Sequence, residues 1–140
     1  MAVGEGEVDT SVKDAGVEYS GVDTCFTVTC LLEDGSYVGG HIALMVPGGK
    51  LDSSQVLGDM KGRFGGQKVT KVHIAGALEN WNPAYLRDPF FIGDDFNTAK
   101  YPEPPSQGDV TDEVRSQLGL DGGTAFTTEQ KKGPFTVKLD

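Results

Sequence analysis

The 140-residue sequence has no long apolar run and no cluster of basic residues. No segment approaches the roughly 20 consecutive apolar residues that a membrane-spanning helix needs. No run of Lys or Arg exceeds two residues, and the formal net charge is −9. A field of that sign repels nucleic-acid phosphates. We therefore expect neither a membrane nor a nucleic acid as a partner.

Metal-ligating side chains are also scarce. Two cysteines and two histidines are too few for the clustered sets of about four ligands that structural zinc sites use. Cys25 and Cys30 lie five residues apart in an expected strand and so point to opposite faces, which argues against a disulfide. Asp94 and Asp95 have no further spaced ligands and fit a solvated turn better than a metal site. The sequence predicts no cofactor and no metal.

The N-terminal segment, residues 1–16, lacks the basic start and apolar core of a secretory signal. Six acidic residues and one lysine give residues 1–24 a net charge of −5. A basic partner could use this charge, but a solvated, frayed terminus is the simpler interpretation. We expect a flexible acidic segment over 1–16 and a single domain over 17–140. The expected location is the cytoplasm, or another cell into which the protein is delivered as an effector.

Glycine is abundant, at 20 residues, about twice its usual share, which indicates many turns and few long helices. Alternating apolar residues predict strands over 17–22, 26–32, 37–46, 69–78, 125–128 and 135–139. The last two strands read as a hairpin around Lys132-Gly133. Helical periodicity predicts helices over about 52–64, with Asp52 as N-cap, and over 110–118. The predicted fold class is α+β: a layered, sandwich-like, mixed or antiparallel sheet packed with two short helices.

Residues 79–109 differ from the rest of the chain. They hold five of the seven prolines and half of the aromatic residues. A long irregular segment of this composition is expected to fold onto the domain, and such loops are often functional. This segment is a candidate protein-binding surface.

Cys25 and His41 are the candidate catalytic residues. Cys25 falls on the polar face of its strand and Cys30 among the core hydrophobes, so Cys25 is the candidate nucleophile. His41 has the polar parity of the adjacent strand, and a thiol beside an imidazole can form a thiolate nucleophile. A tight turn at Asp34-Gly35 would place His41 opposite Thr29, about 13 Å from Cys25. A bulge at Gly39-Gly40, or a turn nearer Glu33, would shorten that separation.

At these residues the sequence resembles the cysteine deamidase superfamily, which includes chemotaxis receptor glutamine deamidases, cytotoxic necrotizing factors and lethal-factor toxins. The resemblance lies in residues 22–25, VDTC, followed by FTVTCLLEDG, VGGHIALMVP and KVTKVHIAGAL, over residues 17–78. A fainter similarity covers 116–139. Asp23-Thr24 replaces the small residues that precede the family's cysteine. Tyr19 stands where chemotaxis members have a threonine, so its main chain is the candidate group that orients the imidazole.

This resemblance implies a cysteine hydrolase that converts a protein's glutamine side chain to glutamate. Cys25 would attack the carboxamide, and His41 would protonate the departing ammonia and activate water. The implied partner is a target protein with a glutamine in an exposed loop. Two alternatives stay open: a non-catalytic binding module that uses 79–109, and a thiol amidase or protease with the same dyad. The oligomeric state stays undetermined at this point.

Overall fold

The computed structural model describes residues 2–12, 15–103 and 105–139. Residues 1, 13 and 14 of the expected flexible segment, Pro104 and Asp140 thus lie outside the described residues. The described strands are β1 (Val8–Ser11), β2 (Val17–Val22), β3 (Phe26–Leu32), β4 (Tyr37–Ile42), β5 (Val69–Gly76), β6 (Phe91–Ile92), β7 (Asp95–Phe96), β8 (Ala125–Gln130) and β9 (Gly133–Val137). The α-helices are α1 (Val56–Gly62) and α2 (Thr111–Leu118), and the 3₁₀ helices are η1 (Leu78–Asn80) and η2 (Pro83–Leu86).

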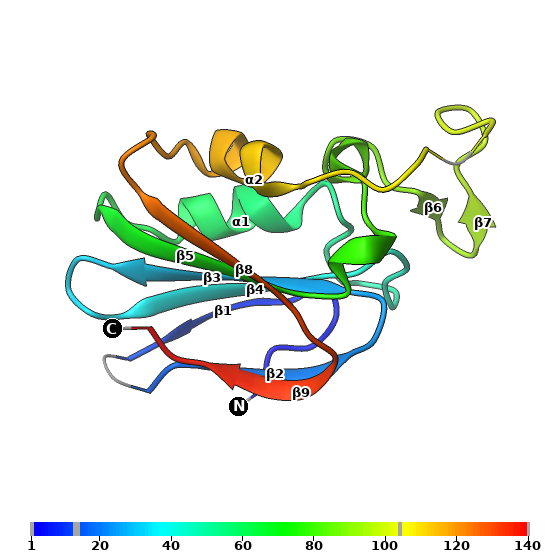
Figure 1. The fold of residues 1–140 in the computed structure, drawn as a ribbon. Coiled ribbons are helices and arrows are strands. Elements are labelled where there is room, and N and C mark those ends of the chain that lie inside the picture. Colours follow the sequence, from blue (N-terminus) through cyan, green and yellow to red (C-terminus); the bar gives the residue numbers. More distant parts are fainter. Residues whose placement is uncertain (1, 13–14, 104, 140) are drawn as a thin grey trace.

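The elements form three layers (Figure 1). The central layer is a five-stranded sheet in the order β1-β4-β3-β5-β8, antiparallel except for the parallel pair β5-β8. The helices α1 and α2 cover one face, and the two-stranded sheet β2-β9 covers the other. The α+β class with a layered sheet and two short helices is therefore confirmed.

Each face of the central sheet has its own core. On the helix side, the inward residues of β3 pack against α1 and α2, as their alternation predicted; they are Phe26, Val28, Cys30 and Leu32. On the other side, a second core forms around Tyr19 and Phe135 from the β2-β9 layer. This second core covers Cys25, Thr27 and Thr29, which are all buried. The face of β3 that the sequence marks as polar is thus an interior layer, because β2 and β9 return to cover it.

The N-terminal residues are more ordered in structure than their sequence suggested. β1 pairs with β4 and forms an edge of the central sheet, and Val3 bridges to Tyr19 of β2. The prediction of an irregular segment was therefore wrong for these residues. The main chain that carries these acidic side chains is hydrogen-bonded to strands of both sheets.

Three element predictions also need correction. β8 pairs with β5 and β9 pairs with β2, so the last two strands belong to different sheets and form no hairpin. β4 ends at Ile42 rather than Val46. Turns occupy residues 53–55, so α1 begins at Val56 with Gln55 as its N-cap, and the prediction of Asp52 as N-cap was wrong. The Asp52 N–H donates to Gln55 Oε1 at 3.0 Å.

The segment 79–109 folds against one end of the sheet. Trp81 is fully buried and packs edge-on against Phe26, with ring centroids 4.7 Å apart. Beyond η2, the short pair β6-β7 projects from the body of the molecule (Figure 1). An aromatic chain runs along this projection through Tyr85, Phe90 and Phe96. The segment is therefore anchored at Trp81 and extended at its tip.

Neither α-helix exceeds eight residues. Within the described ranges, none of the helices has the length and apolar character needed to cross a bilayer.

Candidate active site

The register of β3 and β4 brings Cys25 and His41 onto the same face. Thr27 lies directly opposite His41, and Cys25 precedes Thr27 by two residues. Cys25 lies one residue before β3 and continues the face of Thr27, in the same buried core as Tyr19. Diagonal positions of this kind have Cα atoms about 7–8 Å apart in antiparallel pairs. The loop between the strands is longer than a tight two-residue turn, because Leu31 pairs with Tyr37. The register is thus two residues from the one that placed His41 opposite Thr29.

The imidazole of His41 is fully buried and held at one nitrogen. Its Nδ1 lies 3.0 Å from the main-chain oxygen of Val3. A carbonyl oxygen can only accept, so Nδ1 carries the proton in this bond. In the neutral ring Nε2 is then left with its lone pair, and it has no hydrogen-bond partner within the described part of the chain. The ring is fixed in the tautomer that a general base requires.

The surroundings of His41 keep the ring neutral. Burial lowers the pKa of His41 below its ordinary value of 6.5. The hydrogen bond to Val3 and the charges of Glu5 and Glu7 act in the opposite direction and are outweighed. The imidazole is therefore uncharged near neutral pH and able to accept a proton.

Cys25 is buried, with 3% of its surface exposed. Its Sγ donates to the Glu5 carboxylate, with Sγ and Oε2 3.8 Å apart. Burial raises the pKa of the Cys25 thiol to about 12, and the negative charge of Glu5 adds to the effect. The thiol is thus protonated at neutral pH in this conformation, in contrast to the thiolate that nucleophilic attack needs.

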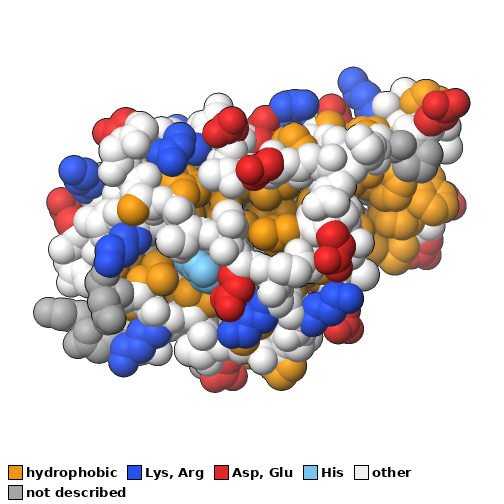
Figure 2. Space-filling model, in the orientation of Figure 1, with side chains coloured by type: hydrophobic (Ala, Val, Ile, Leu, Met, Phe, Trp, Pro, Cys, Tyr) orange, Lys and Arg blue, Asp and Glu red, His pale blue; other side chains and the backbone are white. Residues whose placement is uncertain are grey.

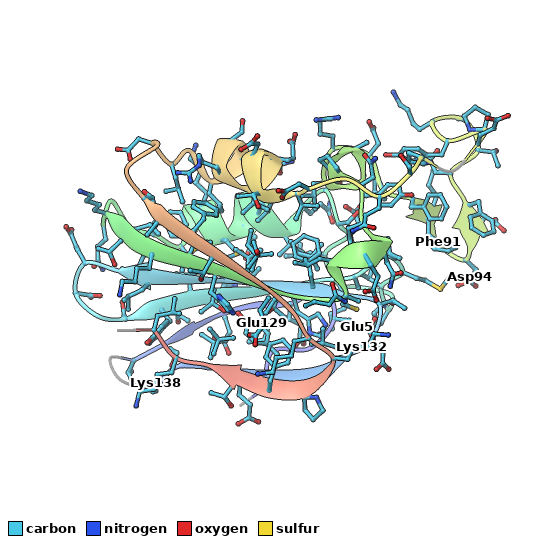
Figure 3. The ribbon with its side chains drawn as sticks, viewed as in Figure 1. Glu5, Phe91, Asp94, Glu129, Lys132 and Lys138 are labelled. Atoms are coloured by element: carbon cyan, nitrogen blue, oxygen red, sulfur yellow. The ribbon has the colours of Figure 1, made fainter. Side chains whose placement is uncertain are left out.

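Glu5 belongs to a turn that lies over both candidate residues. The turn Gly4–Glu7 is closed by the Glu7 N–H, which donates to the Gly4 oxygen at 3.0 Å. Glu5, labelled in Figure 3, lies between the level of the central sheet and that of β2-β9. The charge of Glu5 influences both Cys25 and His41. The N-terminal residues therefore complete the surroundings of the site.

The main chain at Cys25 is fixed from two sides. The indole Nε1–H of Trp81 donates to the Thr24 oxygen at 2.9 Å. The Ala77 N–H donates to the Cys25 oxygen, also at 2.9 Å. A Cβ on Gly76 would lie 2.5 Å from that same oxygen, so only glycine allows this close approach. Segment 79–109 thereby contributes to the position of the candidate nucleophile.

Tyr19 takes a packing role rather than the predicted orienting role. Its hydroxyl hydrogen-bonds the Val28 oxygen at 3.1 Å and Thr29 Oγ1 at 2.7 Å. Its ring stands edge-on to His41, with centroids 6.2 Å apart. The carbonyl that holds the imidazole comes from Val3, because the N-terminal segment inserts between β2 and β4.

The two glycines before His41 allow neighbouring side chains to pack closely against both faces of β4. A Cβ on Gly39 would lie 2.5 Å from the Tyr19 hydroxyl, and one on Gly40 would lie 2.6 Å from Met60 Sδ. The space beside both glycines is therefore filled by side chains of the two outer layers.

The other residues considered from the sequence lie apart from the site. His73 contacts Thr127 and Glu129 of β8, at 2.7 and 3.3 Å. Asp94 and Asp95 lie on the exposed β6-β7 projection. In the described residues, no group of three or more His, Cys, Asp or Glu side chains is arranged to hold a metal ion.

Sequence reasoning missed three residues that shape the site: Val3, Glu5 and Trp81. The first two lie in a segment whose acidic composition suggested a solvated terminus. One signal was available, since Val3 and Val8 are apolar residues that flank the acidic stretch. Trp81 was recognised only as part of an aromatic-rich segment, and its bond to Thr24 depends on tertiary packing.

A scan of the chain against models of known protein families finds no match, and a search of curated proteins finds no similar sequence.

Proposed function

We propose that this protein is a cysteine hydrolase that deamidates glutamine side chains of a target protein. The observation that carries the proposal is the buried His41 imidazole. Its Nδ1 is held by Val3, and among the described residues its Nε2 has no hydrogen-bond partner on the sheet face that also holds Cys25. An unpaired polar atom in an interior is costly, and active sites are one place where such atoms are retained.

The chemistry follows from these two side chains. His41 Nε2 accepts the Cys25 proton, and the sulfur attacks the carboxamide carbon of a glutamine. The tetrahedral intermediate expels ammonia, which takes the proton from Nε2, and a thioester remains. Water then loses a proton to Nε2 and attacks the thioester. The products are glutamate and the restored Cys25 thiol.

Two considerations support a carboxamide substrate over other acyl groups. The first is the resemblance of residues 17–78 to glutamine deamidases. The second is access, because Cys25 is 3% exposed and a peptide backbone cannot approach a sulfur at that depth without major opening. A long side chain needs much less room.

The test is ammonia release from unfolded casein, a glutamine-rich protein, by the purified full-length chain. The Glu5→Ala form is assayed beside it, because Glu5 lies against the thiol. We expect release without chain cleavage, abolished in Cys25→Ser and reduced about 10²-fold or more in His41→Gln. His73→Gln is the matched control and should retain activity. Activity unaffected by Cys25→Ser contradicts the proposal, and chain cleavage supports the protease alternative.

A second candidate function is protein binding through the β6-β7 projection. Ile92, Phe96 and Met45 are exposed to 63%, 60% and 43%, and Figure 2 shows hydrophobic side chains gathered at this end of the molecule. A groove of about 280 Å³ runs between residues 44–50 and 89–93. Asp94 and Asp95 lie beside these residues, so the surface fits a partner whose apolar side chains are flanked by Lys or Arg.

Fluorescent peptides test this second function. A peptide with Leu and Phe between lysines should bind, with affinity that falls as salt rises. The same peptide with glutamates in place of lysines should not bind. An Ile92→Ser/Phe96→Ser variant should lose the binding, whereas Val12→Ser, at an exposed residue of the N-terminal segment, should not. Equal binding of both peptides contradicts this function.

A further inference from the structure

The turn Gly4–Glu7 places the Glu5 carboxylate beside Cys25, where the proposed reaction would form the carboxylate of its glutamate product. Glu5 is the second residue of this turn and is itself exposed. Its side chain nevertheless reaches inward, so that Oε2 lies 3.8 Å from the buried Sγ of Cys25 (Figure 3). Glutamate is the product of glutamine deamidation, and a carboxylate has nearly the shape of a carboxamide.

Main-chain hydrogen bonds hold the turn against the domain, as they would hold a bound peptide. Two main-chain hydrogen bonds join the turn to β4: Gly6 N to His41 O at 3.0 Å, and His41 N to Glu7 O at 3.1 Å. Two more join the preceding residue, Val3, to β2: Val3 N to Glu18 O at 2.7 Å, and Ser20 N to Val3 O at 3.2 Å. Main-chain pairing of this kind is a general mode of peptide recognition. The strand that carries His41 thus both holds the turn and supplies the candidate base.

Ordinary packing does not account for the position of the Glu5 side chain. An exposed glutamate gains more from water than from a neutral thiol, and a buried thiol near a carboxylate is harder to ionise. The other acidic residue of the turn, Glu7, instead bonds Lys50 at 2.6 Å. Only the Glu5 carboxylate is directed at the candidate nucleophile.

We propose that the turn Gly4–Glu7 occupies the substrate site as a built-in product mimic, and that the substrate is a glutamine at the second position of a β-turn. This inference rests on the function proposed above. The substrate is thus defined by the length of its side chain as well as by its carboxamide group. Glu5 lies at the surface while its side chain spans the distance to Cys25, so asparagine, one methylene shorter, falls short.

The direct test is to give the turn a substrate, by the substitution Glu5→Gln. The Cys25 sulfur would attack the carboxamide carbon of the introduced glutamine, and ammonia would leave with the thiol proton by way of His41. Water would then hydrolyse the thioester to glutamate. Intact-mass measurement and peptide mapping should show that residue 5 of the purified full-length protein has become glutamate. Native glutamines such as Gln55 and Gln117 are internal controls and should be unchanged.

Three further variants sharpen the result. Glu5→Gln with Cys25→Ser should keep its glutamine, which separates enzymatic conversion from spontaneous deamidation. Glu5→Asn should keep its asparagine, because of the shorter side chain. Glu5→Ala should make the Cys25 thiol about tenfold more reactive to iodoacetamide, since loss of a neighbouring charge lowers a pKa by about one unit or more. Glu18→Ala, at an exposed residue of β2, is the matched control.

The outcomes separate this inference from the proposed function. Cysteine-dependent conversion of the introduced glutamine supports the inference. If that glutamine persists while Glu5→Ala protein releases ammonia from casein, the inference is overturned and the proposed function stands. If it persists and no form releases ammonia in a Cys25-dependent way, both are overturned. Conversion of the asparagine in Glu5→Asn as readily as the glutamine in Glu5→Gln overturns the assignment of side-chain length.

Discussion

The indole of Trp81 is hydrogen-bonded to the main chain at Thr24, with Nε1 2.9 Å from the carbonyl oxygen. This bond joins a segment of irregular, proline-rich sequence to the residue immediately before the candidate nucleophile. Trp81 is fully buried and packs against Phe26 on the helix side of the sheet. One side chain therefore links the core of the domain, the projecting segment and the site.

Replacing Trp81 with phenylalanine should loosen the site and destabilise the fold. Trp81→Phe keeps an aromatic ring but leaves the Thr24 oxygen without its donor, which should lower the free energy of unfolding by about 1–3 kcal/mol. Alkylation of Cys25 should also become faster, measured in a Cys30→Ala background so that one thiol reports. Urea unfolding gives the first quantity and iodoacetamide kinetics the second.

The control for Trp81→Phe is Tyr101→Phe. It removes a similar bond, from the Tyr101 hydroxyl to the Asp88 oxygen at 2.6 Å, in the same segment. This variant should leave Cys25 alkylation unchanged. An equal acceleration in both variants would show that the segment as a whole, not the bond to Thr24, controls access to Cys25.

The glycines of β4 and α1 should respond to alanine in opposite directions. A Cβ on Gly39 would lie 2.5 Å from the Tyr19 hydroxyl and 2.6 Å from Val17 Cγ1, and such overpacking costs about 1–3 kcal/mol. Gly58, in α1, has open space around its Cβ position, and alanine there should stabilise by about 0.5–1 kcal/mol. Thermal and urea unfolding of Gly39→Ala and Gly58→Ala check both signs. A neutral Gly39→Ala would mean that β2 can move away from β4.

The alternation of β3 was enough to predict the core on its helix side, since Phe26, Val28 and Cys30 face the helices. It could not show that the opposite face is also interior. Cys25 and Thr27 alternate with the apolar residues and so have the sequence pattern of surface residues. A polar side chain can nevertheless be buried when it finds a partner, and the Thr27 hydroxyl donates to the Ala75 oxygen at 2.9 Å. The covering layer comes from β2 and β9, whose pairing joins residues more than 100 positions apart.

The sequence predicted a common face for the two candidate residues but not their surroundings. Periodicity placed Cys25 and His41 on a common face, and the observed register places them closer than a tight turn would. The carbonyl of Val3 and the carboxylate of Glu5 were beyond such reasoning. Val3 acts through its main chain, and Glu5 is one of several acidic residues in its segment. Neither position therefore has a distinctive side-chain pattern. Their roles depend on where the turn Gly4–Glu7 docks.

Tyr19→Phe should separate packing from catalysis. The substitution removes the hydroxyl that bonds the Val28 oxygen and Thr29 Oγ1 in a fully buried position. We expect a loss of about 1–3 kcal/mol in the free energy of unfolding, because a buried hydroxyl loses its partner. Activity of the folded variant should be close to that of the native protein, since Val3 holds the imidazole. A large loss of activity in folded Tyr19→Phe would instead give the Tyr19 hydroxyl a role in the reaction.

The buried His41 should make stability fall as the solution becomes acidic. Its pKa in the folded protein lies below the ordinary value of 6.5, so the unfolded chain binds a proton more readily over that interval. The contribution of His41 to stability is therefore complete above pH 6.5 and declines as the pH falls toward the folded pKa.

Urea unfolding at several pH values between about 7.5 and 5 measures this effect, whose slope for one proton is at most about 1.4 kcal/mol per pH unit. Glu5 and Glu7 lie close enough to influence His41. The comparison is thus made between the native protein and a variant: His41→Gln should have a flatter profile than the native protein. If His41→Gln leaves the slope unchanged, His41 binds its proton equally well in the folded and unfolded protein, which contradicts the lowering of its pKa by burial.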